Sequence, residues 1–176
     1  MLSKTMEKAL NDQVHWELYS AYLYVSMATY FENKGLMGFA NWMHVQDQEE
    51  KLHADKFYNY IVERGGRVIL QAIDAPPHDW TAALAVFENA LAHEQGVTAR
   101  IYTLMDLALE EKDHGTASFL KWFIDEQVEE EANVSDVIAK LKLVDQTPGG
   151  AFMPETPLAI HEPDKGTLEE IVARYA

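Results

Sequence analysis

The sequence contains no cysteine among its 176 residues. Disulfides, thiolate metal ligands and a cysteine nucleophile are therefore excluded, and a reducing compartment such as the cytoplasm is expected. Long apolar runs are also missing. No stretch approaches the roughly 18 residues that a membrane-spanning helix needs, and the first residues lack the apolar core of a signal peptide. We expect a cytoplasmic protein with no membrane partner.

Basic residues are scarce as well. Lysine and arginine together number 14 against 29 aspartates and glutamates, which leaves a formal net charge of −15. Nucleic acid is an unfavourable partner for such a chain, because lysine and arginine are the residues that neutralise phosphates. An acidic surface attracts cations, but acidity also serves solubility alone. The charge by itself does not decide between these two roles.

Glycine and proline are rare before residue 146, and they divide the chain into four long segments. The first three segments span residues 3–33, 36–64 and 80–112. The fourth follows a short break at 113–115 and continues to residue 144. Each segment would extend about 45 Å as a helix of about 30 residues. The tail ends in Thr167-Leu-Glu-Glu170, a capping-box pattern that predicts a short C-terminal helix. We therefore expect a helical domain over 1–145 and a tail over 146–176.

An alternating spacing of four and three residues picks out one stripe on each segment. In the first segment the stripe is Met6, Leu10, Gln13, Glu17, Ser20, Tyr24, Met27 and Phe31. Four such stripes predict an all-α fold, a four-helix bundle whose stripes face the core. The connection over 65–79 is long enough to cross the length of the bundle, so we expect a crossover between the second and third helices.

Each stripe is apolar at both ends and polar in the middle. The interruptions are Glu17 in the first segment, Glu50 and His53 in the second, Glu94 in the third, and Gln127 and Glu130 in the fourth. Adding 77 to the numbers of the first three residues reaches the last three, so the chain repeats one polar pattern in its two halves. The i,i+3 pairs each lie on one helix face. The pattern therefore predicts that about six polar side chains converge in the core.

Four carboxylates in a core repel one another and lose their hydration, at several kcal/mol per ion. No lysine or arginine lies on the stripes to neutralise them. Either their pKa values are strongly raised so that the glutamates are protonated, or cations occupy the site. Two divalent ions would balance four glutamates, and oxygen-rich ligands with one imidazole favour iron or manganese over structural zinc or copper. A stripe displaced by one residue, with its glutamate in solvent, is the alternative for any single helix.

These residues have a known counterpart. Glu17, Glu50-Lys-Leu-His53, Glu94 and Gln127-Val-Glu-Glu130 resemble the ferroxidase centre of bacterial and archaeal non-haem ferritins. The resemblance covers roughly residues 3–144. It implies that Glu17 and His53 bind a first iron, Glu94 a second, and that Glu50 bridges them. It also implies that Glu130 is a ligand of the second iron or of both, and that Gln127 hydrogen-bonds a bound oxygen species or water.

The resemblance implies further functional residues. Glu49, Glu126 and Glu129 resemble the third iron site of this family, although a solvated acidic face explains the same three residues. Tyr24 and Trp122 resemble its redox-active aromatic residues. Tyr24 lies seven residues after Glu17 and could bond to the site or relay an electron, whereas a core tyrosine with a satisfied hydroxyl is the simpler interpretation.

The implied activity is that of a ferroxidase, in which dioxygen or hydrogen peroxide oxidises two Fe(II) per subunit. The ferric product would be stored in a hollow homo-oligomer, usually of 24 subunits. Haem is not expected, because Leu52 and Glu130 stand where haem-binding relatives have a methionine and a histidine. Two other interpretations stay open. One is a shell that binds metal without catalysis, and the other is a small di-iron oxygenase or peroxidase.

Overall fold

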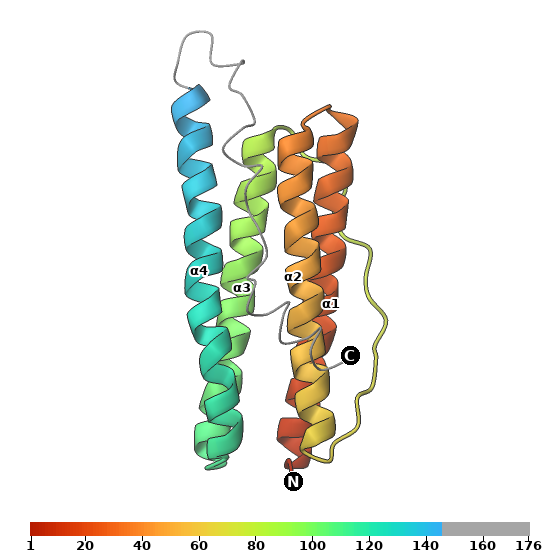
Figure 1. Cartoon of the computed structure of the whole chain (residues 1–176), viewed down its shortest axis with the longest axis vertical. Coiled ribbons are helices and arrows are strands. Elements are labelled where there is room, and N and C mark those ends of the chain that lie inside the picture. The colour runs from red at the N-terminus through yellow and green to blue at the C-terminus, as the bar shows by residue number, and fades with distance from the viewer. Residues whose placement is uncertain (146–176) are drawn as a thin grey trace, which may run out of the picture. The chain divides into compact units, whose positions relative to one another are not determined.

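The computed structural model describes residues 1–145, and within them the chain is helical with no strand. Four long helices follow one another: α1(Lys4–Asn33), α2(Met37–Glu63), α3(Ala83–Glu110) and α4(His114–Asp145) (Figure 1). None of these helices has an apolar stretch long enough to traverse a bilayer. The expected C-terminal helix and the tail over 146–176 lie outside the described residues.

The predicted segments match the helices to within a few residues, with two corrections. The third helix begins at Ala83 rather than near Trp80. Ala82 is extended, with φ −161° and ψ 165°, and the Trp80 indole instead donates a hydrogen bond of 3.1 Å to Asn89 on the first turns of α3. The fourth helix already begins at His114, because the side chain of Asp113 accepts the Thr116 backbone N–H at 3.1 Å and so caps it.

The described residues form two compact units. One contains residues 1–3 and 10–79, with most of α1 and all of α2, and the other contains residues 4–9 and 80–145, with α3 and α4. In the first, the turn that follows α1 contains Gly35, whose φ of +73° suits glycine. The Leu36 N–H bonds back to the Phe31 carbonyl at 3.0 Å and completes the turn. The two helices run antiparallel, since their contacts pair late residues of α1 with early residues of α2. Glu32 meets His44, and Tyr24 packs edge-on against Trp42.

The connection after α2 crosses the length of this helix pair, as predicted. It starts at Gly65, with φ +76°, and runs without helix or strand beside α1 (Figure 1). Near the start of α1, the Asn11 side chain bonds to backbone groups of the connection. Near the end of the connection, the Pro77 carbonyl accepts a hydrogen bond of 2.7 Å from the Ser26 hydroxyl of α1.

The second unit is also an antiparallel helix pair. Its short turn contains Lys112, a non-glycine residue with φ +57°, and the Asp113 N–H bonds to the Ala108 carbonyl at 2.9 Å. Contacts along the pair join early residues of α3 to late residues of α4, and Glu88 meets Lys142 at 3.0 Å. Figure 1 shows α3 and α4 side by side along their length.

Candidate metal centre

The polar residues in the middle of the four stripes are all buried. Their exposed fractions are 1% for Glu17, 4% for Glu50, 3% for His53, 0% for Glu94, 3% for Gln127 and 4% for Glu130. The alternative that the glutamates lie in solvent is therefore wrong for every helix. The apolar parts of the stripes are buried with them, from Met6 to Phe31 on α1 and from Phe87 to Ala108 on α3.

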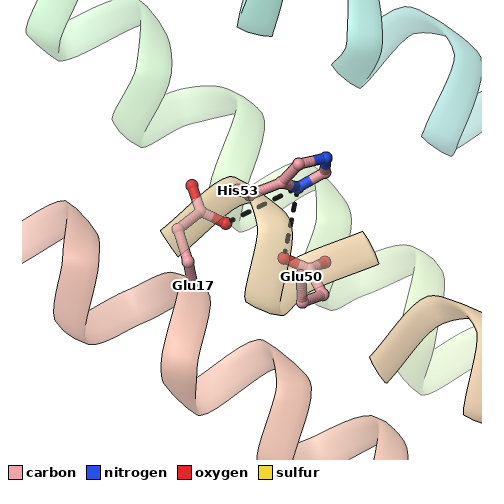
Figure 2. A group of neighbouring side chains, drawn as sticks. All are labelled: Glu17, Glu50 and His53. Atoms are coloured by element: carbon pink, nitrogen blue, oxygen red, sulfur yellow. Dashed lines mark ion pairs between the residues drawn. The ribbon is translucent and has the colours of Figure 1, made fainter. Parts of the chain in front are cut away.

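In the first unit, antiparallel pairing brings Glu17 of α1 level with Glu50 and His53 of α2 (Figure 2). His53 Nδ1 lies 3.5 Å from Glu50 Oε2 and 3.9 Å from Glu17 Oε2. One ligand atom from each residue lies within 4.8 Å of the others. Two carboxylates and one imidazole at this spacing form a donor set that suits a divalent transition metal.

A buried glutamine orients the first carboxylate. Gln13, one turn before Glu17 on the same stripe, donates from Nε2 to Glu17 Oε1 at 2.8 Å. Glu17 Oε2, which faces His53 (Figure 2), accepts no hydrogen bond within the described residues. Because a buried carboxylate oxygen without a donor is costly, a bound cation would stabilise this atom. Sequence reasoning placed Gln13 on the stripe but assigned it no role.

In the second unit, Glu94 of α3 and Gln127 of α4 are in contact. Gln127 Nε2 lies 3.3 Å from Glu94 Oε2 and 3.3 Å from the Thr98 hydroxyl. Thr98 in turn donates to Glu131 Oε1 at 2.6 Å. Glu130 follows Gln127 on the stripe and is buried. Thr98 and Glu131 each lie one residue beyond a stripe position, so periodicity alone did not mark them.

The three glutamates of the predicted third site differ in their surroundings. Glu49 of α2 is buried, with 7% of its surface exposed, and accepts a hydrogen bond from Gln46. Glu126 of α4 is half-buried and Glu129 is exposed. Glu49 lies in the first unit and the other two in the second. A shared iron site for them stays a prediction.

Tyr24 lies about 10 Å along α1 from Glu17, at 1.5 Å per residue. It is 1% exposed, and its ring packs edge-on against Trp42 with 6.2 Å between the centroids. Trp122 of α4 is half-buried and packs against Phe123 at 4.8 Å. Both the relay and the core interpretation of Tyr24 stay open.

The chain matches the family model of the ferritin-like domain over residues 7–144. It is 46% identical over 132 residues to a bacterial non-heme ferritin of Staphylococcus aureus, covering 75% of this chain and 80% of that protein. It is 41% identical over 165 residues to a bacterial non-heme ferritin of Staphylococcus saprophyticus, covering 94% of this chain and 99% of that protein.

Among solved structures, an open-pore ferritin of the hyperthermophilic archaeon Archaeoglobus fulgidus superposes with a TM-score of 0.88 at 46% identity. The match covers 92% of this chain and 100% of that one. An engineered closed form of the Archaeoglobus fulgidus ferritin also superposes with a TM-score of 0.88. These matches confirm the predicted all-α, four-helix fold of the ferritin type. With its family model spanning both helix pairs, the chain belongs to the ferritin family.

Proposed function

We propose that the chain is an iron-storage subunit with ferroxidase activity, which oxidises Fe(II) at a two-metal centre inside each subunit. The observation that carries this proposal is the buried group of Glu17, Glu50 and His53, with ligand atoms within 4.8 Å of one another. The names of its relatives, bacterial non-heme ferritins, support the same function. The buried Glu94, Gln127 and Glu130 repeat the same spacing in the second helix pair.

The two sets of residues have distinct proposed roles. Glu17 and His53 bind the first Fe(II), Glu94 binds the second, and Glu50 bridges the two. Glu130 is a ligand of the second iron or of both, and Gln127 hydrogen-bonds a water or an oxygen species. Four glutamates carry four negative charges, which two Fe(II) ions neutralise, so substrate binding relieves the repulsion among the buried carboxylates.

In the reaction each Fe(II) loses one electron. Dioxygen accepts two electrons and two protons to form hydrogen peroxide, and hydrogen peroxide accepts two electrons and two protons to form water. The protein contributes the spacing of the two metals, their charge balance and the exclusion of bulk water. Tyr24, about 10 Å along α1 from Glu17, is proposed to relay an electron to or from the site. Glu49, Glu126 and Glu129 are proposed to hold a third iron on its way to storage.

The storage compartment is proposed to be a hollow homo-oligomer of 24 subunits in the cytoplasm, with residues 1–145 as the bundle and 146–176 as a tail. No haem is expected, because position 52 is leucine and position 130 is glutamate. Native mass spectrometry of the purified protein tests the assembly. A mass of one or two chains would instead favour a small di-iron oxygenase or peroxidase.

Rapid mixing of the metal-free protein with Fe(II) and dioxygen tests the activity. A fast phase that consumes about two Fe(II) per subunit is expected from a two-metal centre, and it should disappear in the Glu50→Ala, His53→Ala double variant. The matched control is Lys51→Ala, which removes an exposed partner of Asp47 on the same helix. A normally assembled shell that takes up iron only at the rate of uncatalysed oxidation would favour the non-catalytic alternative.

A further inference from the structure

The hydrogen bonds around Gln127 have a direction, and that direction starts at Glu131. An ionised carboxylate only accepts hydrogen bonds, whereas a hydroxyl has a single proton to donate. Thr98 uses that proton on Glu131 Oε1, at 2.6 Å. Towards Gln127, 3.3 Å away, the Thr98 oxygen is therefore left only as an acceptor.

This polarity determines which end of the Gln127 amide faces α3. A carboxamide presents a donor NH2 on one branch and an acceptor oxygen on the other. Two side-chain neighbours of Gln127 Nε2 are acceptors: the Thr98 hydroxyl and Glu94 Oε2, each at 3.3 Å. The backbone carbonyl of Glu94 lies at 3.3 Å as well. With the amide reversed, its oxygen would face three acceptors and lose every one of these bonds.

We propose that Thr98 and Glu131 are positioning residues of the metal centre, which hold the Gln127 amide with its NH2 on the Glu94 carboxylate. Two consequences follow for the ligands. One oxygen of Glu94 is oriented by a neutral donor. Gln127 Oε1, the acceptor of the amide, is directed away from Glu94 and Thr98. The role of these residues in metal binding rests on the proposed function, whereas the direction of the hydrogen bonds is a property of the metal-free protein.

In the first helix pair a glutamine also donates to a ligand glutamate, but there the two residues lie on the same helix. There Gln13 donates to Glu17 Oε1 at 2.8 Å. Glu94 is the repeat of Glu17, shifted by 77 residues, but the position that repeats Gln13 is Ala90, which has no amide. The second half therefore takes its donor from the partner helix. An amide that reaches across from α4 needs an anchor of its own, and Thr98 with Glu131 supplies it. Outer partners of this type commonly change metal affinity by about 10–100-fold.

The test uses the assembled, metal-free protein and Co(II), a redox-inert probe whose visible absorption reports binding. T98V should lower Co(II) affinity at this centre by about tenfold, and T98S, which keeps the hydroxyl, should restore it. E131Q should fall between them, because the introduced amide can offer Thr98 either a donor or an acceptor. The controls are T103V, whose exposed hydroxyl donates only to the Ala99 carbonyl on the same helix, and D136N on α4.

A double-mutant cycle separates positioning from general damage to the fold. In a Q127A background T98V should cause no further loss of affinity, since the group that it orients is gone. Equal losses in both backgrounds, or wild-type affinity in T98V alone, would overturn the inference. T98A replaces T98V if the valine variant fails to assemble.

Crystal structures of the metal-free wild type and T98V provide a readout that does not depend on metal. In the wild type Gln127 should contact Thr98 and Glu94, and in T98V it should leave Glu94 or lose a single orientation. An unchanged Gln127 in T98V would sink the inference. A wild type that binds no Co(II) would reject the two-metal centre instead, while these structures would still decide the orientation of the amide.

Discussion

Gln13 and Glu17 form a buried pair one helical turn apart, with 2.8 Å between the donor Nε2 and the acceptor Oε1. Gln13 is 2% exposed and Glu17 is 1% exposed. A neutral donor satisfies one carboxylate oxygen without adding a charge beside it, which leaves the second oxygen to face His53. The pair explains why a polar residue precedes the glutamate on an otherwise apolar stripe.

Replacing Gln13 by leucine should therefore weaken metal binding more than it disturbs the helix. The buried Glu17 carboxylate loses a charge-assisted hydrogen bond, worth about 1.5–3 kcal/mol, and its orientation is released. Co(II) affinity, measured by absorption titration, should fall by about tenfold or more. The control is Gln71→Leu, which removes an exposed amide bonded to Asp12. Equal affinity in the two variants would contradict the proposed role of Gln13.

The buried carboxylates should make the metal-free wild type less stable than a variant in which one of these carboxylates is neutralised. Glu50→Gln removes one charge near Glu17 with little change of shape, and so relieves the repulsion between two neighbouring buried carboxylates. We expect a higher thermal midpoint for metal-free Glu50→Gln than for the metal-free wild type. A lower midpoint would mean that neighbouring protein groups already compensate the Glu50 charge.

Metal should reverse that order. A ligand that binds only the folded state stabilises it by about 2.7 kcal/mol when present at 100 times its dissociation constant. The wild type should gain this stability from Co(II), whereas Glu50→Gln should gain much less because a bridging ligand has lost its charge. Differential scanning calorimetry with and without Co(II) measures both effects. Equal gains would exclude Glu50 as a ligand.

Asn11 should hold the long connection against α1. Its Nδ2 donates to the Arg67 carbonyl at 3.0 Å, and its Oδ1 accepts the Ile69 N–H at 2.6 Å. Asn11→Ala removes both bonds from a largely buried position, which should cost about 1–3 kcal/mol. Hydrogen exchange followed by mass spectrometry should show faster exchange in peptides that contain Ile69. Unchanged protection there would show that other contacts hold the connection.

The turn between α3 and α4 offers two changes of opposite sign. Asp113 accepts both the N–H and the hydroxyl of Thr116, so Asp113→Ala should destabilise the protein by about 1 kcal/mol through loss of the N-cap.

Lys112 has φ +57°, a conformation that costs a non-glycine residue about 1–2 kcal/mol. Lys112→Gly should raise the thermal midpoint, less the added entropy of the unfolded chain. A decrease on Lys112→Gly would mean that the lysine side chain makes a contact worth more than its backbone strain.

The sequence predicted the helices well because their signals are local. A spacing of four and three marks a buried stripe regardless of what packs against it, and Gly35 and Gly65 end their helices through their own positive φ angles. The start of α3 was placed too early because Trp80 is apolar and fits a helical pattern. Its indole instead bonds to Asn89 from outside the helix, a contact that no periodicity reveals.

The sequence by itself determined the four helices, the buried stripes and the ligand types at their centres, since these follow from residue spacing and from the cost of burying charge. Only the tertiary structure decided which atoms donate to which. The approach of His53 to Glu17 depends on how α1 and α2 are paired in register. The direction of the bond from Thr98 to Glu131 depends on rotamers chosen by packing between α3 and α4. Hydrogen bonds require an approach to within a few tenths of an ångström, and a repeat of 3.6 residues carries no information on that scale.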